Sequence, residues 1–145
     1  MAFPFSFKGP ELLTPSSTKR IDVVSYQGRL IGAAELFIGK VRQITYAFIY
    51  YIEIRPAFRG QGICGQLLQE VNKFLEESRR LGLLQNFLNA PDSTYNFYEH
   101  YGWLPIPWQG RKKWMYYPSR EIDSKLFPQL IFDAQRRAQR IINKL

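Results

Sequence analysis

The chain has 145 residues, 46% of them hydrophobic, which suffices for one domain with a packed core and excludes extensive disorder. Its 20 Lys and Arg against 12 Asp and Glu give a net charge of +8, which attracts polyanionic partners without choosing among them. The single Cys64 excludes an internal disulfide, and the longest apolar run, "YAFIYYIEI", is far shorter than the ~20 residues of a bilayer span. Because "MAFPFSFKGP" lacks the continuous apolar region of a signal peptide, we expect a cytoplasmic protein without a membrane span.

The first part of the chain predicts strands. Residues 1–19 contain several prolines and are expected to form an extended lead-in rather than a long helix. The stretch "RIDVVSYQGRLIGAAELFIG" then predicts two strands that turn at Gln27 and Gly28. A long third strand is predicted for "ITYAFIYYIEIR", because β-branched and aromatic residues dominate it and Pro56 stops it.

The second part predicts helices that alternate with strands. Apolar residues recur at helical spacing over residues 61–80, which predicts a helix. "LLQNFLNA" predicts a strand, "DSTYNFYEHYG" a short helix and "RKKWMYY" a closing strand. Residues 119–145 are expected to carry one basic amphipathic helix. The order predicts a mixed α/β domain over residues 20–118, with the last helix packed on it or placed at a dimer interface.

A glycine-rich turn follows the third strand. The stretch "EIRPAFRGQGICGQLLQEV" has the pattern G-x-G-x-x-G at Gly60, Gly62 and Gly65. This pattern is typical of dinucleotide-binding turns, but those folds need an acidic residue at the tip of the next strand, where this chain has Asn89. A Walker loop is excluded because no Gly-Lys-Ser/Thr follows. The unpaired N–H groups that open the next helix, the helix dipole and Arg59 nevertheless favour a bound phosphate.

The same stretch resembles the pyrophosphate-loop signature of the GCN5-related N-acetyltransferase (GNAT) family. "IRPAFRGQGICGQLL" is similar to V-x-P-x-x-R-G-x-G-[IV]-[GA]-x-x-L-[LM] nearly throughout, with Cys64 where the family usually has Gly or Ala. "TYNFYEHYGW" resembles a second family motif, A-x-x-F-Y-x-x-x-G-F. The resemblance covers roughly residues 20–117. It implies a mixed, mostly antiparallel sheet that is flanked by helices. It also implies that acetyl-CoA is the acyl donor. No Cys/His cluster in the sequence suggests a metal site.

The resemblance also implies which residues hold acetyl-CoA. The backbone of Ile52, Glu53 and Ile54 would pair with the pantetheine arm, and an N–H near Ile54 would stabilise the oxyanion of the reaction. The loop that would hold the pyrophosphate consists of Arg59, Gly60, Gln61, Gly62, Ile63, Cys64 and Gly65.

Acetyl transfer to an amine requires a base for the amine and an acid for the leaving thiolate. A lysine amine with a pKa near ~10.4 is neutral only about one part in 10³ at pH 7, a penalty of roughly 4–5 kcal/mol. By resemblance, Tyr98 is the general acid. The base is either Glu53 or a water held by Tyr50. The resemblance also implies a bulge in the strand before the loop, and this bulge leaves open which face of the sheet each of the two side chains occupies.

The chain departs from the family pattern at its start. The family's usual fold opens with a strand and two helices that form one wall of the acceptor site, whereas here the first strong strand arrives by Ile21. An open acceptor site suits a protein or another macromolecule better than a buried small molecule. We therefore predict an N-acetyltransferase acting on a primary amine. The alternatives are a non-catalytic CoA-binding module and a basic nucleic-acid-binding protein, including one that acetylates aminoacyl-tRNA.

Overall fold

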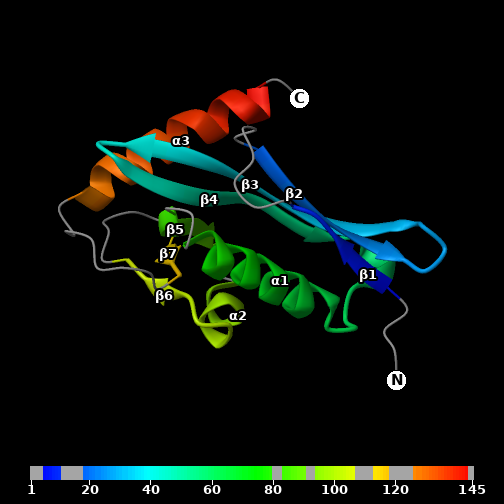
Figure 1. The fold of residues 1–145 in the computed structure, drawn as a ribbon. Helices are drawn as coiled ribbons and strands as arrows, with labels where there is room; N and C mark the ends of the chain where they lie inside the picture. Colours follow the sequence, from blue (N-terminus) through cyan, green and yellow to red (C-terminus); the bar gives the residue numbers. More distant parts are fainter. Residues whose placement is uncertain are drawn as a thin grey trace.

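The computed structural model describes residues 5–10, 18–79, 83–90, 94–106, 113–117 and 126–143. Within these ranges seven strands form one sheet in the order β1-β2-β3-β4-β5-β7-β6 (Figure 1). Neighbouring strands are antiparallel except β4 and β5, which are parallel. This sheet confirms the predicted mixed, mostly antiparallel α+β fold.

The elements follow the predicted order with short additions. The strands are β1 (Phe5–Lys8), β2 (Thr18–Ser25), β3 (Leu30–Val41), β4 (Ile44–Ile54), β5 (Leu83–Ala90), β6 (Leu104–Pro105) and β7 (Lys113–Tyr116). The helices are the 3-10 turn η1 (Pro56–Phe58), α1 (Ile63–Ser78), α2 (Tyr95–His100) and α3 (Phe127–Asn143). The additions are β1, η1 and β6. β1 lies within the expected lead-in, where Phe5 and Phe7 alternate with polar residues and pack against the core.

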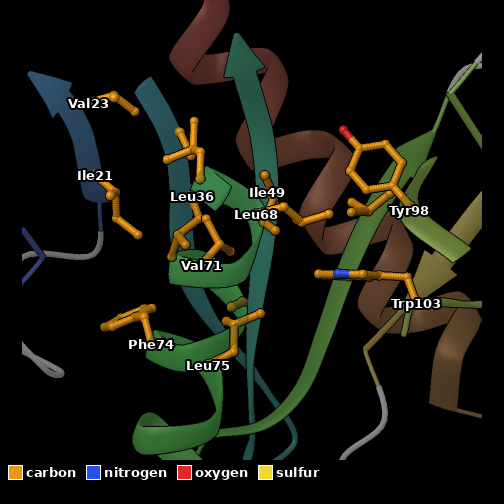
Figure 2. Close-up of a cluster of buried hydrophobic side chains, with 14 of the residues drawn as sticks. Ile21, Val23, Leu36, Ile49, Leu68, Val71, Phe74, Leu75, Tyr98 and Trp103 are labelled. Carbon is orange, nitrogen blue, oxygen red and sulfur yellow. The ribbon is translucent and has the colours of Figure 1, made fainter. Parts of the chain in front are cut away.

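Helices cover both faces of the sheet (Figure 1). α1 and α2 lie on one face, which we call the α1 face, and α3 crosses the other, which we call the α3 face. Figure 2 shows Leu68, Val71 and Leu75 of α1 beside Leu36 and Ile49 of the sheet. Their burial follows from the helical spacing of apolar residues in α1, which places one apolar stripe against the strands.

The apolar stripe of α3 is buried on its own sheet. The cluster beneath it consists of Phe37, Tyr46, Phe48, Ile106, Trp114, Leu130, Ile131, Ala134 and Ala138. A dimer interface through α3 would therefore use its outer face, where Phe132 is 67% exposed. Residues 119–125 of the expected C-terminal segment lie outside the described ranges. Of the helices in the described ranges, none has the length and apolar character needed to span a membrane.

Candidate active site

The two parallel strands at the centre of the sheet diverge. β4 pairs with β5 from Thr45 to Ile49, but β4 continues to Ile54 without further pairing to β5. The divergence opens a cleft of about 280 Å³. It is lined by Ile49, Tyr50, Tyr51, Ile52, Leu88, Thr94 and Tyr98. The edge of β4 beyond the split is therefore open to another extended chain or ligand.

A bulge in β4 lies at the point of the split. Glu35 of β3 lies opposite Tyr51, but the next residue of β3, Leu36, lies opposite Ile49. Tyr50 is therefore an extra residue of β4 with no partner of its own in β3. Such an insertion shifts the alternation of side chains between the two faces of a strand.

The bulge brings Tyr50, Tyr51 and Glu53 to one face. Ile52 packs in the core of the α1 face, whereas Tyr50 packs against the cluster of the α3 face. The Tyr51 hydroxyl donates a hydrogen bond of 2.8 Å to Oε2 of Glu53. The two residues considered as the base, Glu53 and Tyr50, thus both lie on the α3 face. The sequence leaves this orientation open, because the bulge depends on the register with β3.

Tyr98 reaches the cleft from α2. It is only 7% exposed, and Figure 2 shows its hydroxyl at the end of the ring that points away from Trp103. Burial, and secondarily the nearby Cys64, raise the pKa of Tyr98 to about 12. The hydroxyl therefore keeps its proton at neutral pH, as a general acid must.

Tyr50 and Glu53 differ in how they meet the cleft. Burial and the nearby Glu35 carboxylate raise the pKa of Tyr50, which lines the cleft, to about 12. The Glu53 side chain is 48% exposed and lies outside the cleft lining, with Oε1 3.1 Å from Nη2 of Arg59. The other carboxylate oxygen of Glu53, Oε2, accepts the hydrogen bond of the Tyr51 hydroxyl, so both oxygens already have a partner.

The glycine loop has the geometry of an anion cradle. Gly60 and Gly62 have φ of 82° and 76°, a region that favours glycine, and apart from their chain neighbours no described residue has an atom within 4 Å of where a Cβ would stand. Gly62 caps α1, and no acidic residue or side-chain cap occupies the helix start in this described segment. The first N–H groups of α1 and the positive end of its dipole therefore remain available, which fits a pyrophosphate.

Gly65 has a different role from the other two glycines. A Cβ at this position would lie 2.0 Å from the Tyr101 hydroxyl oxygen. Gly65 therefore allows α1 and the end of α2 to approach closely. The predicted loop residues Gln61, Ile63 and Cys64 flank these glycines; Ile63 is buried in the core, and burial raises the pKa of the half-buried Cys64 thiol.

Arg59 connects the loop to the end of β4. Its Nε donates a hydrogen bond of 2.9 Å to the Ile54 carbonyl oxygen, and its Nη2 pairs with Glu53. The predicted cofactor residues of β4 and of the loop are thus brought together. Asp, Glu, His and Cys side chains form no group of three that could hold a metal in the described residues.

Several residues of this region are not predicted from the sequence: Tyr51, Leu88 and Thr94 line the cleft, and Glu35 lies opposite Tyr51. Glu35 pairs with Arg20 of β2 and lies near Tyr50, whose pKa it helps to raise. The signal that could have found it is a single acidic residue inside the apolar run "LIGAAELFIG". Its relation to the cleft still depends on strand register.

The model of the family described as "Acetyltransferase (GNAT) domain" matches residues 18–104. A search of curated proteins finds no match. Among solved structures, a Trypanosoma brucei acetyltransferase is 23% identical and has a TM-score of 0.55, covering 66% of this chain and 68% of that one. The Thermoplasma acidophilum PaiA N-acetyltransferase in complex with coenzyme A is 18% identical, with a TM-score of 0.53 and coverage of 70% and 60%. AtaT complexed with acetyl-methionyl-tRNAfMet is 15% identical, with a TM-score of 0.59 and coverage of 79% and 76%.

The family match spans more than half of the chain and includes β2 to α2, the split strands and the glycine loop. At these identities the solved structures establish the shared fold. The chain therefore belongs to the GNAT family of acetyltransferases.

Proposed function

We propose that the protein transfers the acetyl group of acetyl-CoA to a primary amine by direct attack of the amine on the thioester. The observation that carries this proposal is the divergence of β4 from β5, which opens a cleft at Tyr98 and leaves the edge of β4 unpaired toward the glycine loop. Acetyl-CoA supplies the activated acetyl group. Residues 59–65 would hold its pyrophosphate, and the backbone of residues 52–54 would pair with its pantetheine arm.

In this proposal Tyr98 donates a proton to the sulfur as the carbon–sulfur bond breaks. Tyr50 is better placed than Glu53 to meet the amine, since Tyr50 lines the cleft and Glu53 is held by Arg59 and Tyr51. The acceptor side of the cleft is accessible: Tyr51, at its rim, is an exposed aromatic residue. This accessibility supports a macromolecular acceptor.

Aminoacyl-tRNA is one acceptor that specific observations favour. A solved structure of the same fold contains an acetylated aminoacyl-tRNA. The net charge of +8 and the exposed Arg136 and Arg140 of α3 would attract a polyanion. A protein amine remains the other candidate, and a direct comparison of acceptors distinguishes them.

The first test is calorimetry of the purified protein with acetyl-CoA, with NADH as a nucleotide control. We expect micromolar binding of acetyl-CoA and none of NADH, because the loop lacks the acidic ribose partner of a dinucleotide site. Release of CoA thiol would then be measured with a lysine peptide, spermidine and methionyl-tRNA as acceptors. Absence of acetyl-CoA binding, or of thiol release with every amine, would contradict the proposal.

Gly62→Ala tests the loop itself, with Gly28→Ala as its matched control. Both glycines have positive φ, 76° and 83°, and open space at the Cβ position, so both changes should destabilise the fold by about 1 kcal/mol through backbone strain. Only Gly62 lies at the start of α1, where the added methyl group would occupy the cradle. We expect acetyl-CoA affinity to fall at least about tenfold in Gly62→Ala alone. Equal affinities in the two variants would show that the loop does not hold the donor.

A further inference from the structure

Glu35 lies beside the cleft at the middle of β3. It is opposite Tyr51 of β4 and opposite Arg20 of β2, so its side chain shares the α3 face with both. The side chain is 26% exposed and forms an ion pair with Nη1 of Arg20. Arg20 pairs through Nε with Asp22 as well. The carboxylate of Glu35 is therefore held in place from the β2 side.

Tyr50 joins this carboxylate to the cleft. Burial and the nearby Glu35 carboxylate raise the pKa of its hydroxyl, and its ring packs against Phe37 with 5.9 Å between the ring centroids. Tyr50 is also one of the residues that line the cleft. Its proximity to Glu35 exists because of the bulge, since an extra residue lets Tyr50 and Tyr51 lie on the same face opposite Glu35.

Among the described residues, the charged and titratable groups that face Glu35 are Arg20 on β2 and Tyr50 and Tyr51 on β4. The Tyr51 hydroxyl is taken by Glu53, so Tyr50 is the neighbour that links Glu35 to the cleft. A second tyrosine–carboxylate pair, Tyr51 and Glu53, is more exposed, and its Glu53 forms an ion pair with Arg59 of the loop. Of the two pairs, the one formed by Tyr50 and Glu35 is better shielded from bulk water.

We propose that Glu35 accepts, through the Tyr50 hydroxyl, the proton that the acceptor ammonium must lose before it attacks. This inference rests on the proposed function and assigns the base of the same site. Glu35 is a positioning residue that acts through Tyr50, and Tyr50 is the group that meets the amine.

The step balances in protons and electrons. The ammonium gives a proton to the Tyr50 oxygen while Tyr50 gives its own proton to the Glu35 carboxylate. The nitrogen lone pair then forms a bond to the thioester carbon, the carbon–sulfur bond breaks, and the thiolate takes the proton of Tyr98. Tyr98 recovers a proton from the nitrogen that becomes the amide, and Glu35 releases its proton to water.

The test compares Glu35→Gln, Tyr50→Phe and the double variant with Asp22→Asn. Asp22 binds the same Arg20 and has no part in the proposed site, so Asp22→Asn controls for the loss of one ion pair. Using the amine best acetylated among the three acceptors, we expect kcat/KM to fall on the order of 10²-fold in each single variant. The double variant should lose no more than either single variant, because the two residues act as one unit. Asp22→Asn should stay within about twofold of the wild type.

The pH profile separates proton transfer from a structural role. With the lysine peptide as acceptor, the loss of kcat/KM in Glu35→Gln should shrink about tenfold per pH unit as the pH approaches ~10, because a growing fraction of the lysine amine is already neutral. Glu35→Asp, which keeps a carboxylate, should retain more activity than Glu35→Gln. Acetyl-CoA binding by calorimetry should be unchanged in all variants.

Three results would overturn the inference while leaving acetyl transfer intact. The first is a kcat/KM of Glu35→Gln within twofold of that of Asp22→Asn, and the second is a double variant whose loss of kcat/KM equals the product of the two single losses. The third is a loss of kcat/KM in Glu35→Gln that does not change with pH. A large loss in Glu53→Gln with none in Glu35→Gln would assign the base to Glu53 instead. A wild-type protein that fails to bind acetyl-CoA would overturn the proposed function, and this inference with it.

Discussion

Tyr98→Phe is expected to lower kcat on the order of 10³-fold and to leave acetyl-CoA binding unchanged. Removal of the hydroxyl deprives the departing thiolate of its proton donor, while the buried ring that packs against Phe97 and Trp103 is retained. Because the pKa of Tyr98 is raised to about 12, its ionisation should not reduce wild-type activity below pH ~10. The measurement is steady-state thiol release, with donor affinity determined separately by calorimetry.

Tyr26→Phe is the control for this change, because Tyr26 is an exposed tyrosine in the turn between β2 and β3. It should retain full activity. If Tyr98→Phe kept more than about a tenth of the wild-type kcat, Tyr98 would not be the acid and its role would be to pack α2 on the sheet. A loss of acetyl-CoA binding in Tyr98→Phe would instead assign the hydroxyl to the donor site.

Asp133→Ala is expected to lower the free energy of unfolding by about 3 kcal/mol, a factor of roughly 10² in the unfolding equilibrium. Asp133 is 7% exposed and accepts a hydrogen bond from the hydroxyl of Tyr46, which is fully buried under α3. Its other contacts are Nη2 of Arg136 at 3.0 Å and Nε of Arg137 at 2.8 Å. Because both guanidinium groups are partly exposed, most of the loss comes from the hydrogen bond between the buried Tyr46 hydroxyl and Asp133. Urea unfolding at pH 7 measures this loss, with the exposed Gln129→Ala of α3 as the control.

The same contacts predict how this stability depends on pH. Burial opposes ionisation of Asp133, but the Tyr46 hydroxyl and the two guanidinium groups more than offset it, so its folded pKa lies below the ordinary 3.8. A carboxylate with a depressed folded pKa stabilises the fold above its unfolded pKa, and this stabilisation is lost as the pH falls through the folded pKa. The difference between wild type and Asp133→Ala should therefore be full at pH 7 and should shrink below about pH 4. An unchanged difference at pH 3 would contradict this account.

The family assignment and most of the elements could be predicted from the sequence because their signals are local. Glycines that need positive φ, a strand stopped by Pro56 and apolar residues at helical spacing each specify a backbone conformation over a few residues. The motif around Tyr98 likewise placed it on a short helix, where the structure has α2. For β1 the sequence predicts only an extended lead-in, because a short strand is stabilised mainly by its neighbour, here β2.

Other features of the site depend on contacts between residues far apart in the chain. The bulge at Tyr50 exists in the register between β3 and β4, and this register alone places Tyr50 and Glu53 on one face and Glu35 beside the cleft. Gly65 belongs to the glycine pattern, yet its neighbour is Tyr101, 36 positions away in the numbering. Local patterns determine backbone conformation, but side-chain neighbours across strands and helices follow from packing and register. The family and the loop therefore follow from local patterns in the sequence, whereas the positions of the candidate carboxylates follow from the register between strands.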